Sequence, residues 1–218
     1  MRVLAIDTVG PVIGVALVVD GRCEVRTERI ARGAESRLMP WATELCAGAG
    51  VVLADLDGVA VSRGPGAFTG LRVGLAAALG VAWAAGCPVW ACDSLLPRAQ
   101  VGRTPGVPLL VALDARKSRV YAALYGDDGV VEPAADVAPE VAAGWSEGPF
   151  EATGEGSAVY ADVIGAAGGR VLPDPTDPCV GALAALGAAA IGRGEGVDPA
   201  TVQPLYLRQP DAKLPKRG

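Results

Sequence analysis

The sequence predicts an α/β protein of two lobes, each a mixed β-sheet flanked by helices. Three observations predict this: short strands alternate with helices, the order of elements partly repeats in the second half, and a stretch rich in turn residues, Gly102 to Pro108, separates the halves. With 218 residues, 51% of them hydrophobic and 20% charged, the chain can bury a large core. We expect a first lobe over residues 1–103, a smaller second lobe over 104–191, and a C-terminal segment of about 192–218 that packs back on the first.

The first lobe is predicted to open with a three-stranded meander. Its strands are expected at Arg2 to Asp7, Val12 to Val19 and Arg22 to Arg29, and Asp20-Gly21 is a strong hairpin signal between the last two. The third strand alternates arginine and glutamate with smaller residues. We therefore expect it to be half exposed, near a sheet edge.

A helix is expected next, with Ser36 as its N-cap and about Ala47 as its end, because apolar residues recur at helical spacing. After it come a buried strand at Gly58 to Ser62, a glycine turn, and an apolar helix from Leu71 to Ala85. A strand at Val89 to Cys92 and a short helix capped by Ser94 complete the unit. Three strands, a helix, a strand and a helix are the order of a ribonuclease-H-like unit, so this interpretation rests on fold analogy.

The second half partly repeats this order. Strands are expected at Leu109 to Leu113 and Val120 to Tyr125, and helices near Pro139 to Trp145 and Ser157 to Ala167. A proline-rich break then precedes an alanine-rich helix, Val180 to Ile191, which is a candidate to pack back on the first lobe.

Composition excludes several classes of function. The net charge is −5 with only 19 lysines and arginines, so the broad basic surface that holds nucleic acid is missing. The chain has no histidine, which removes the usual serine or cysteine triad, the usual metallopeptidase and a conventional zinc site. Its five cysteines form no Cys-x-x-Cys pair and lie in apolar surroundings, so we expect buried, reduced thiols. No metal or cofactor is predicted.

One uncharged run has the length of a membrane span. It covers the twenty residues from Val73 to Cys92, but alanine and glycine dominate it and Gly86-Cys87-Pro88 interrupts it. A buried helix followed by a buried strand explains it better. The N-terminus leads straight into a strand with no signal peptide, so the cytoplasm is the expected location.

The stretch Ser62 to Gly74 is the most informative in the chain, because it packs four glycines, a proline and two arginines between a strand and a helix. It fits neither known nucleotide signature, since no Lys-Ser/Thr pair follows Gly70 and three residues separate Gly66 from Gly70. Two interpretations stay open. The turn could offer backbone N–H groups to a phosphate, a carboxylate or another chain, or its glycines could serve close packing alone.

Small residues recur every four positions beyond this turn, at Gly66, Gly70, Gly74 and Ala78. They form one stripe along a helix, which lets a second helix of the same or another chain approach closely.

The segment Arg63 to Gly74 resembles the signature of the TsaB (YeaZ) family, which acts in bacterial tRNA threonylcarbamoyladenosine biosynthesis. Three further segments agree in type and order: Leu4 to Thr8, Leu113 to Lys117 before Val120-Tyr121, and Pro204 to Arg208. Together they span nearly the whole chain. The resemblance implies the two-lobed actin, sugar-kinase and Hsp70-like architecture, built of ribonuclease-H-like repeats. Ala67 departs from the pattern by replacing the usual serine, which removes a possible N-cap.

The resemblance also implies a role. Members of the family are non-catalytic partners of TsaD, a related protein that transfers a threonylcarbamoyl group to the adenosine next to the anticodon of tRNAs reading codons that begin with A. The first two helices are implied to contact the TsaD-like paralogue, while a TsaE-like ATPase docks at the shared interface and tRNA binds only through the complex. We expect the following residues to form or support that interface: Leu38, Trp41, Leu45, Gly70, Leu71, Gly74 and Ala78.

Two alternatives come from other classes. A small-molecule kinase or ATPase of the same fold would place phosphates near Asp7 and Thr8, although these side chains are equally suited to satisfying backbone groups where the strand ends. A homodimer with a scaffolding role is the other alternative, because a surface that fits a related partner can also pair with itself.

Overall fold

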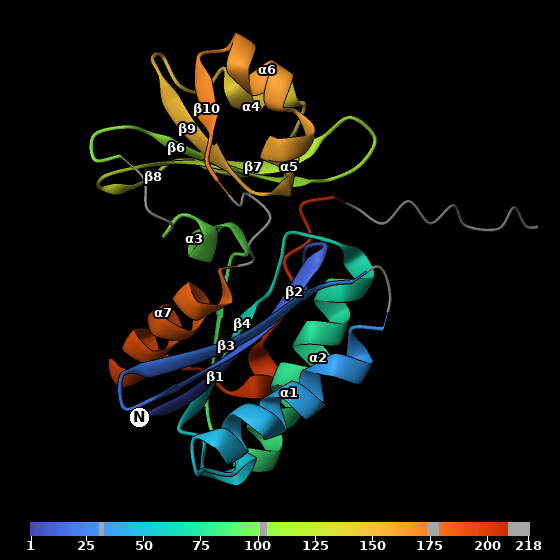
Figure 1. Ribbon diagram of the computed structural model, residues 1–218, viewed down its shortest axis with the longest axis vertical. Coiled ribbons are helices and arrows are strands. Elements are labelled where there is room, and N and C mark those ends of the chain that lie inside the picture. The colour runs from blue at the N-terminus through green and yellow to red at the C-terminus, as the bar shows by residue number, and fades with distance from the viewer. Residues whose placement is uncertain (31–32, 101–103, 174–178, 209–218) are drawn as a thin grey trace, which may run out of the picture.

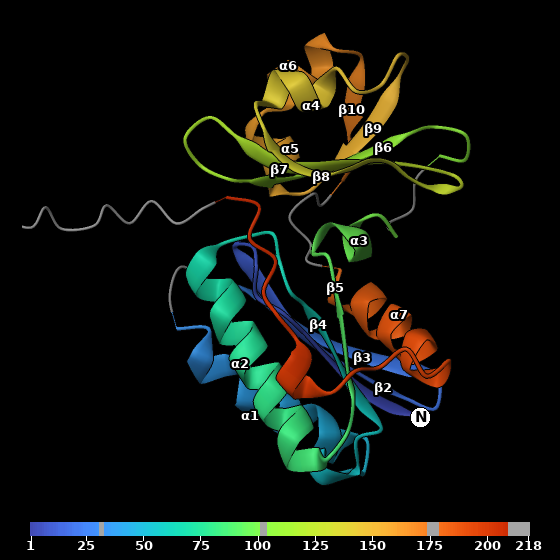
Figure 2. The same ribbon diagram turned by 180° about the vertical axis from the view of Figure 1, so that it is seen from behind.

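The protein has two stacked lobes, each built on a five-stranded sheet, as a computed structural model describes for residues 1–30, 33–100, 104–173 and 179–208. Figures 1 and 2 show the lobes one above the other, with α3 between them. The first sheet has the strand order β3-β2-β1-β4-β5 and the second the order β10-β9-β6-β7-β8. In each, three antiparallel strands are followed by two parallel ones, so the two sheets repeat one topology. The predicted fold class, a two-lobed α/β protein of ribonuclease-H-like repeats, is confirmed.

The strands of the first sheet have the predicted bounds: β1 Arg2–Asp7, β2 Val12–Val19, β3 Arg22–Arg29, β4 Gly58–Ser62 and β5 Val89–Cys92. Asp20 and Gly21 make the hairpin turn with positive φ at both residues, as their types allow. β3 is the terminal strand, and most of its residues are exposed on both faces rather than half exposed. The expectation that all cysteines are buried is wrong for Cys23, which lies exposed on this strand, whereas the other four are buried.

Helices cover both faces of the first sheet. On one face lie α1 (Glu35–Gly48) and α2 (Phe68–Ala85), and on the other lies α7 (Val180–Gly192) (Figure 1). The alanine-rich α7 packs on β1, β2 and β4 with Leu183 and Ala184 buried, although its residues fall within the range 104–191 expected for the second lobe. α7 packs on the first sheet because its surface carries no charged side chain and is stabilised by burial against an apolar sheet.

Of the two predicted helix caps, the one at Ser36 is wrong and the one at Ser94 is confirmed in position only. The N-cap of α1 is Ala34, and the hydroxyl of Ser36, one residue inside the helix, donates to the carbonyl oxygen of Gly33. Ser94 is the N-cap residue of α3 (Leu95–Arg98), as predicted, but its side chain makes no cap hydrogen bond, and Asp93 accepts from the Leu95 amide at 2.7 Å. Ser94 Oγ instead accepts from the Gly64 amide at 3.0 Å, so a tertiary contact competes successfully with the local cap.

The helix α2 is long and apolar enough to cross a membrane, judged by its length and composition alone. One face of it, including Leu71, Leu75 and Ala78, is buried against β1 and β4, and Gly86 ends it in the left-handed conformation. These contacts agree with the interpretation of the apolar run as a core helix followed by a strand. Ala67 caps α2 with no side-chain hydrogen bond, as its replacement of serine implies.

The second lobe contains three strands that were not predicted. Alongside β6 (Leu109–Asp114) and β7 (Val120–Gly126) lie β8 (Gly129–Val137), β9 (Phe150–Thr153) and β10 (Gly169–Val171). The helices of this lobe are short: α4 Pro139–Ala143, α5 Glu155–Val159 and α6 Ala161–Ala166. Part of the predicted linker and most of the proline-rich break, residues 102–103 and 174–178, lie outside the described residues.

A shared core joins the two lobes. Leu109, Val111 and Tyr125 of the second sheet belong to the same buried cluster as the α1, α2 and β1 side chains of the first lobe. Beyond α7 the chain returns along the first lobe, pairing Val197 with Val89 and adding a short 3-10 turn, Pro199–Thr201, beside α2 (Figure 2). The lobes are therefore held together by apolar packing as well as by the chain connections.

Candidate functional site

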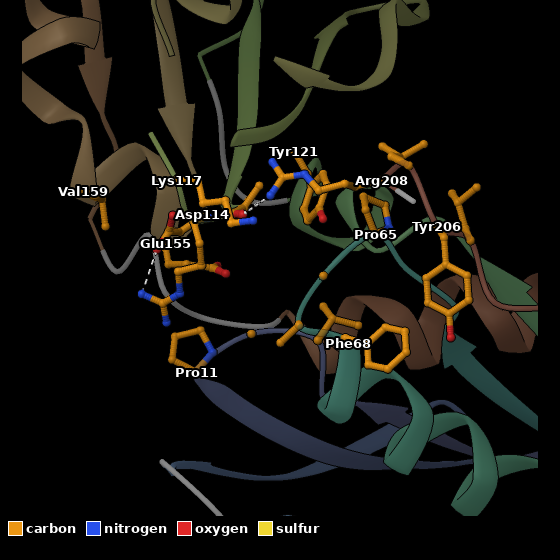
Figure 3. Close-up of a pocket in the computed structure, with 18 of the residues that line it drawn as sticks. Pro11, Pro65, Phe68, Asp114, Lys117, Tyr121, Glu155, Val159, Tyr206 and Arg208 are labelled. Atoms are coloured by element: carbon orange, nitrogen blue, oxygen red, sulfur yellow. Dashed lines mark hydrogen bonds and ion pairs between the residues drawn. The ribbon is translucent and has the colours of Figure 1, made fainter. Parts of the chain in front are cut away.

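A cleft of about 1240 Å³ opens between the lobes. Figure 3 shows Pro11, Pro65 and Phe68 of the first lobe facing Asp114 and Tyr121 of the second across it. Cations line its mouth at Arg29, Arg116, Lys117 and Arg208, and carboxylates at Asp114 and Glu155.

The four segments that carry the family resemblance converge on this interlobe cleft. Each supplies lining residues or lies directly beside them: Val9 and Gly10 after β1, Pro65 to Phe68 before α2, Asp114 to Lys117 with Tyr121 around the β6–β7 turn, and Leu205 to Arg208 near the C-terminus. They are far apart in sequence, so only the fold brings them together.

Asp7 lies at the end of β1, where its side chain is completely buried and fully engaged in a polar network. Its Oδ2 accepts from Ser62 Oγ at 2.8 Å and from Arg98 Nη1 at 3.0 Å, and its Oδ1 accepts from the Val9 amide at 3.1 Å. Thr8 donates its hydroxyl to the Gly70 carbonyl oxygen at 2.6 Å. The Asp7 and Thr8 side chains therefore form hydrogen bonds within their own chain. This supports their structural role over contact with a phosphate.

Arg98 is the residue of this network that the sequence did not single out. Its side chain is 2% exposed, and Nη1 also donates to the Ser94 carbonyl oxygen at 2.6 Å. Burial alone would lower the pKa of Arg98, but the carboxylates of Asp7 and Glu155 outweigh it and raise the pKa. A lone arginine in the otherwise uncharged stretch from Leu95 to Ala99 was the available signal, because a charge in such a place needs a buried partner.

Glu155 links this network to the cleft. It is the first residue of α5 and a lining residue of the cleft, and its carboxylate lies beside Gly10. Burial raises the pKa of Glu155, and the nearby Arg98 guanidinium opposes that shift. A carboxylate in this position repels anions, so it does not favour a phosphate at the Asp7 end of the cleft.

The glycine turn is closely packed against its own chain. A Cβ at Gly66 would lie 2.5 Å from Val9 Cβ, one at Gly70 would lie 2.1 Å from the Thr8 carbonyl oxygen, and one at Gly74 would lie 2.1 Å from Thr8 Oγ1. The small-residue stripe therefore receives the β1–β2 connection rather than a second helix. This geometry supports the packing interpretation of the glycines.

Residues Pro204–Arg208, which we call the C-terminal strap, bridge the two lobes. On the first lobe the Leu205 amide donates to the Arg63 carbonyl oxygen at 2.7 Å. Tyr206 stacks on Phe68 with ring centroids 5.5 Å apart, and its hydroxyl accepts from Arg72 Nε at 3.0 Å.

The strap meets the second lobe through Arg208. Its guanidinium makes a bidentate pair with Asp136 of β8, at 2.7 and 2.9 Å, and donates to the Ala115 carbonyl oxygen at 2.9 Å. Burial alone would raise the pKa of Asp136, but hydrogen bonds from Arg208 and Arg119 outweigh it and lower the pKa. The strap is thus attached to both sides of the cleft.

Most of the residues predicted for a partner interface point inward. Leu38, Leu45 and Leu71 are each 1% exposed, and Ala78 is fully buried in the core under α1 and α2. Trp41 is partly buried against the same core. With Gly70 and Gly74 packed on Thr8, these residues support the two-helix layer from beneath.

The outer surface of α2 carries other residues. Ala76, Gly80 and Trp83 face solvent at helical spacing, with Trp83 72% exposed and open space around Gly80. Met39 is 38% exposed on the neighbouring α1. These exposed residues are apolar or small, which is a composition suited to a partner.

Within the described residues, no three His, Cys, Asp or Glu side chains gather closely enough to hold a metal ion.

Comparison with known proteins gives consistent results. A family model described as "TsaD: tRNA N6-adenosine threonylcarbamoyltransferase" matches residues 25–161. The protein TsaB of Escherichia coli, named for tRNA threonylcarbamoyladenosine biosynthesis, is 31% identical across 99% of both chains. An uncharacterized protein of Mycobacterium tuberculosis is 38% identical over 97% of this chain and 93% of its own length. The solved structure of YeaZ from Pseudomonas aeruginosa superposes with a TM-score of 0.78 at 31% identity, covering 94% of this chain and 99% of that one.

Proposed function

The chain belongs to the TsaB (YeaZ) family of tRNA threonylcarbamoyladenosine biosynthesis proteins, and on that basis we propose that it is the non-catalytic partner subunit of a complex containing a TsaD-like paralogue. That complex would make threonylcarbamoyladenosine next to the anticodon of tRNAs reading codons that begin with A. The subunit would work in the cytoplasm.

The observation that carries the proposal is the two-helix layer of α1 and α2. Its inner side is fixed by buried leucines, while Ala76, Gly80 and Trp83 are exposed on α2 and Met39 is exposed on α1. A packed helix layer with exposed apolar and small residues on its outer side is suited to helix-on-helix docking. We therefore place the paralogue on the outer face, with the predicted interface residues as its internal support.

The proposed absence of catalysis rests on the chemistry of the chain. Asp7, which a kinase or ATPase of this fold would be expected to place near phosphates, is paired with Arg98 and Ser62. The sequence also has no histidine to act as a general base. Its net charge of −5 supports binding of tRNA through the complex rather than by this subunit. A TsaE-like ATPase would dock at the junction of the two related subunits.

Binding between this chain and the TsaD-like paralogue of the same organism tests the proposal. Gly80→Arg places a long cation on the outer face of α2, where open space lets the monomer fold, and should weaken binding at least tenfold. Trp83→Ala should also weaken it, because exposed tryptophans are frequent interface anchors.

Gly165→Arg is the matched control. Gly165 is likewise an exposed helical glycine with open space around it, but it lies on α6 of the second lobe. Calorimetric titration should give wild-type affinity for this variant. Equal affinities for all variants would place the contact elsewhere.

A small-molecule kinase or ATPase is the second candidate, and the size of the interlobe cleft favours it, since about 1240 Å³ is enough for a nucleotide. Measurable ATP turnover by the isolated chain would support this candidate. Turnover only after addition of the paralogue would support the partner role instead.

A further inference from the structure

Glu155 is a half-buried carboxylate of the interlobe cleft without an ion-pair partner among the described residues. Three arginines around the cleft each pair with a different carboxylate: Arg98 with Asp7, Arg116 with Asp114 and Arg208 with Asp136. None of these ion pairs includes Glu155. An ionised Glu155 therefore acts on the cleft with a charge that no nearby pairing neutralises.

Two glycines fix the position of Glu155. Gly154 has a φ of 92°, and a Cβ there would lie 2.1 Å from the Ala112 carbonyl oxygen. A Cβ at Gly156 would lie 2.8 Å from the Leu113 carbonyl carbon. The backbone on both sides of Glu155 therefore packs directly on β6, with no room for a side chain at either neighbour. Glu155 extends into the cleft from a rigid support, so its carboxylate stays there.

The Glu155 carboxylate meets the first lobe at Gly10. A Cβ at Gly10 would lie 3.5 Å from both carboxylate oxygens and 3.7 Å from Arg98 Nη2. Figure 3 shows Glu155 facing Pro11, the residue that follows Gly10 in the chain. The carboxylate thus occupies the space beside the β1–β2 connection, at the Asp7 end of the cleft.

The cations of the cleft lie in a more exposed position than Glu155. Four of them line it: Arg29, Arg116, Lys117 and Arg208. The first three are exposed, whereas Glu155 is half-buried, and a charge is screened less where water is partly excluded. An oxyanion is therefore attracted to the exposed part of the cleft and repelled from the Asp7 end.

We propose that Glu155 determines the ligand specificity of the interlobe cleft, because its ionised carboxylate excludes phosphate and carboxylate groups from the Asp7 end. A ligand that reaches this end must carry a neutral or cationic group there, since the oxygens of an ionised Glu155 accept hydrogen bonds and donate none. The proposal concerns the cleft alone and does not depend on the partner role of α1 and α2.

The exclusion should depend on pH. Burial raises the pKa of Glu155, and the Arg98 guanidinium opposes this shift. The charges of Asp7 and Asp114 also raise the pKa of Glu155, so the net shift is upward. A protonated Glu155 has no charge to repel an anion. Oxyanions should therefore enter the Asp7 end below the raised pKa and be excluded above it. The chain has no histidine that could produce a similar pH dependence.

Titration of the isolated chain with sulfate tests the proposal, followed by the amide resonance of Gly10 in isotope-labelled protein at constant ionic strength. Sulfate keeps its charge between about pH 5 and about pH 9, so a change in affinity reports on the protein. Wild-type affinity should fall at least about tenfold over this range. Glu155→Gln keeps the side-chain volume without the charge, so it should bind sulfate equally at both pH values. Glu155→Asp keeps a titratable carboxyl group and should retain the pH dependence.

Glu140→Gln is the matched control. Glu140 also lies in the first turn of a short helix of the second lobe, but it is exposed on α4 and does not line the cleft. This variant should behave as the wild type, and melting temperatures show whether each variant folds. Wild-type affinity that is the same at both pH values would overturn the proposal. So would Glu155→Gln that binds sulfate no more tightly than the wild type at about pH 9. Paralogue binding is measured separately, so these results leave the proposed function untouched.

Discussion

Replacement of Arg98 by methionine tests the assignment of Asp7 to a structural network. The Asp7 and Arg98 side chains are 0% and 2% exposed, and their closest atoms, Oδ2 and Nη1, are 3.0 Å apart. Arg98→Met keeps much of the side-chain volume but leaves the Asp7 carboxylate buried with only Ser62 and the Val9 amide as donors among the contacts described here.

The expected loss follows from that burial. Removing one member of a buried ion pair costs roughly 3–5 kcal/mol, against a total stability of about 5–15 kcal/mol for a domain. Asp7→Asn should also destabilise the protein. The double variant Asp7→Asn with Arg98→Met should cost clearly less than the two single losses combined, since no unpaired charge remains.

Urea unfolding followed by fluorescence of the four tryptophans gives the free energy of unfolding for each variant. A loss below about 1 kcal/mol for Arg98→Met is what an exposed ion pair would give, and it would refute the assignment. If the double variant loses as much free energy of unfolding as the two single variants combined, the direct coupling of Asp7 to Arg98 is refuted.

Two other predictions concern the packing of the glycine stripe and the attachment of the C-terminal strap. Gly74→Leu should lower the melting temperature of the isolated chain, because its Cβ would lie 2.1 Å from Thr8 Oγ1. Gly80→Leu should leave the melting temperature unchanged, because nothing lies within 4 Å of a Cβ there. Equal melting temperatures for the two variants would contradict the close packing of the stripe. Burial alone would raise the pKa of Asp136, but hydrogen bonds from Arg208 and Arg119 lower it below the ordinary value of 3.8. The ion pair between Asp136 and the strap is therefore complete above pH 3.8, and it is lost as the pH falls through the lower pKa of the folded protein. Amide exchange of the strap, corrected for its intrinsic pH dependence, should accelerate over that range in the wild type, and Asp136→Asn should show no such step.

Local patterns were enough to place the first sheet. Alternating or β-branched runs ended by Asp20-Gly21 and by the glycine turn gave strand bounds that agree with β1 to β5. The unpredicted strands lack such signals. β8 contains Pro133 and several alanines, and β9 and β10 are only four and three residues long. The pairing of β8 with β7, of β9 with β6 and of β10 with β9 decides their conformation, which no short window of sequence reveals.

The site shows the same limit. The stripe of small residues identified a face of α2 but not what it meets, and the structure gives that place to Thr8. Arg98 and Asp7 are 91 residues apart, so no local spacing could pair them. Ser94 was a reasonable cap by type, yet its hydroxyl serves the Gly64 amide. In each case a long-range contact decided the role of the residue.

Mass spectrometry of nucleosides from total tRNA tests the proposed role most directly, in source cells depleted of this protein and supplied with the wild type, Gly80→Arg or Gly165→Arg. The partner-subunit account predicts loss of threonylcarbamoyladenosine on depletion, recovery with the wild type and Gly165→Arg, and little recovery with Gly80→Arg. An unchanged level of the modified nucleoside after depletion would contradict it.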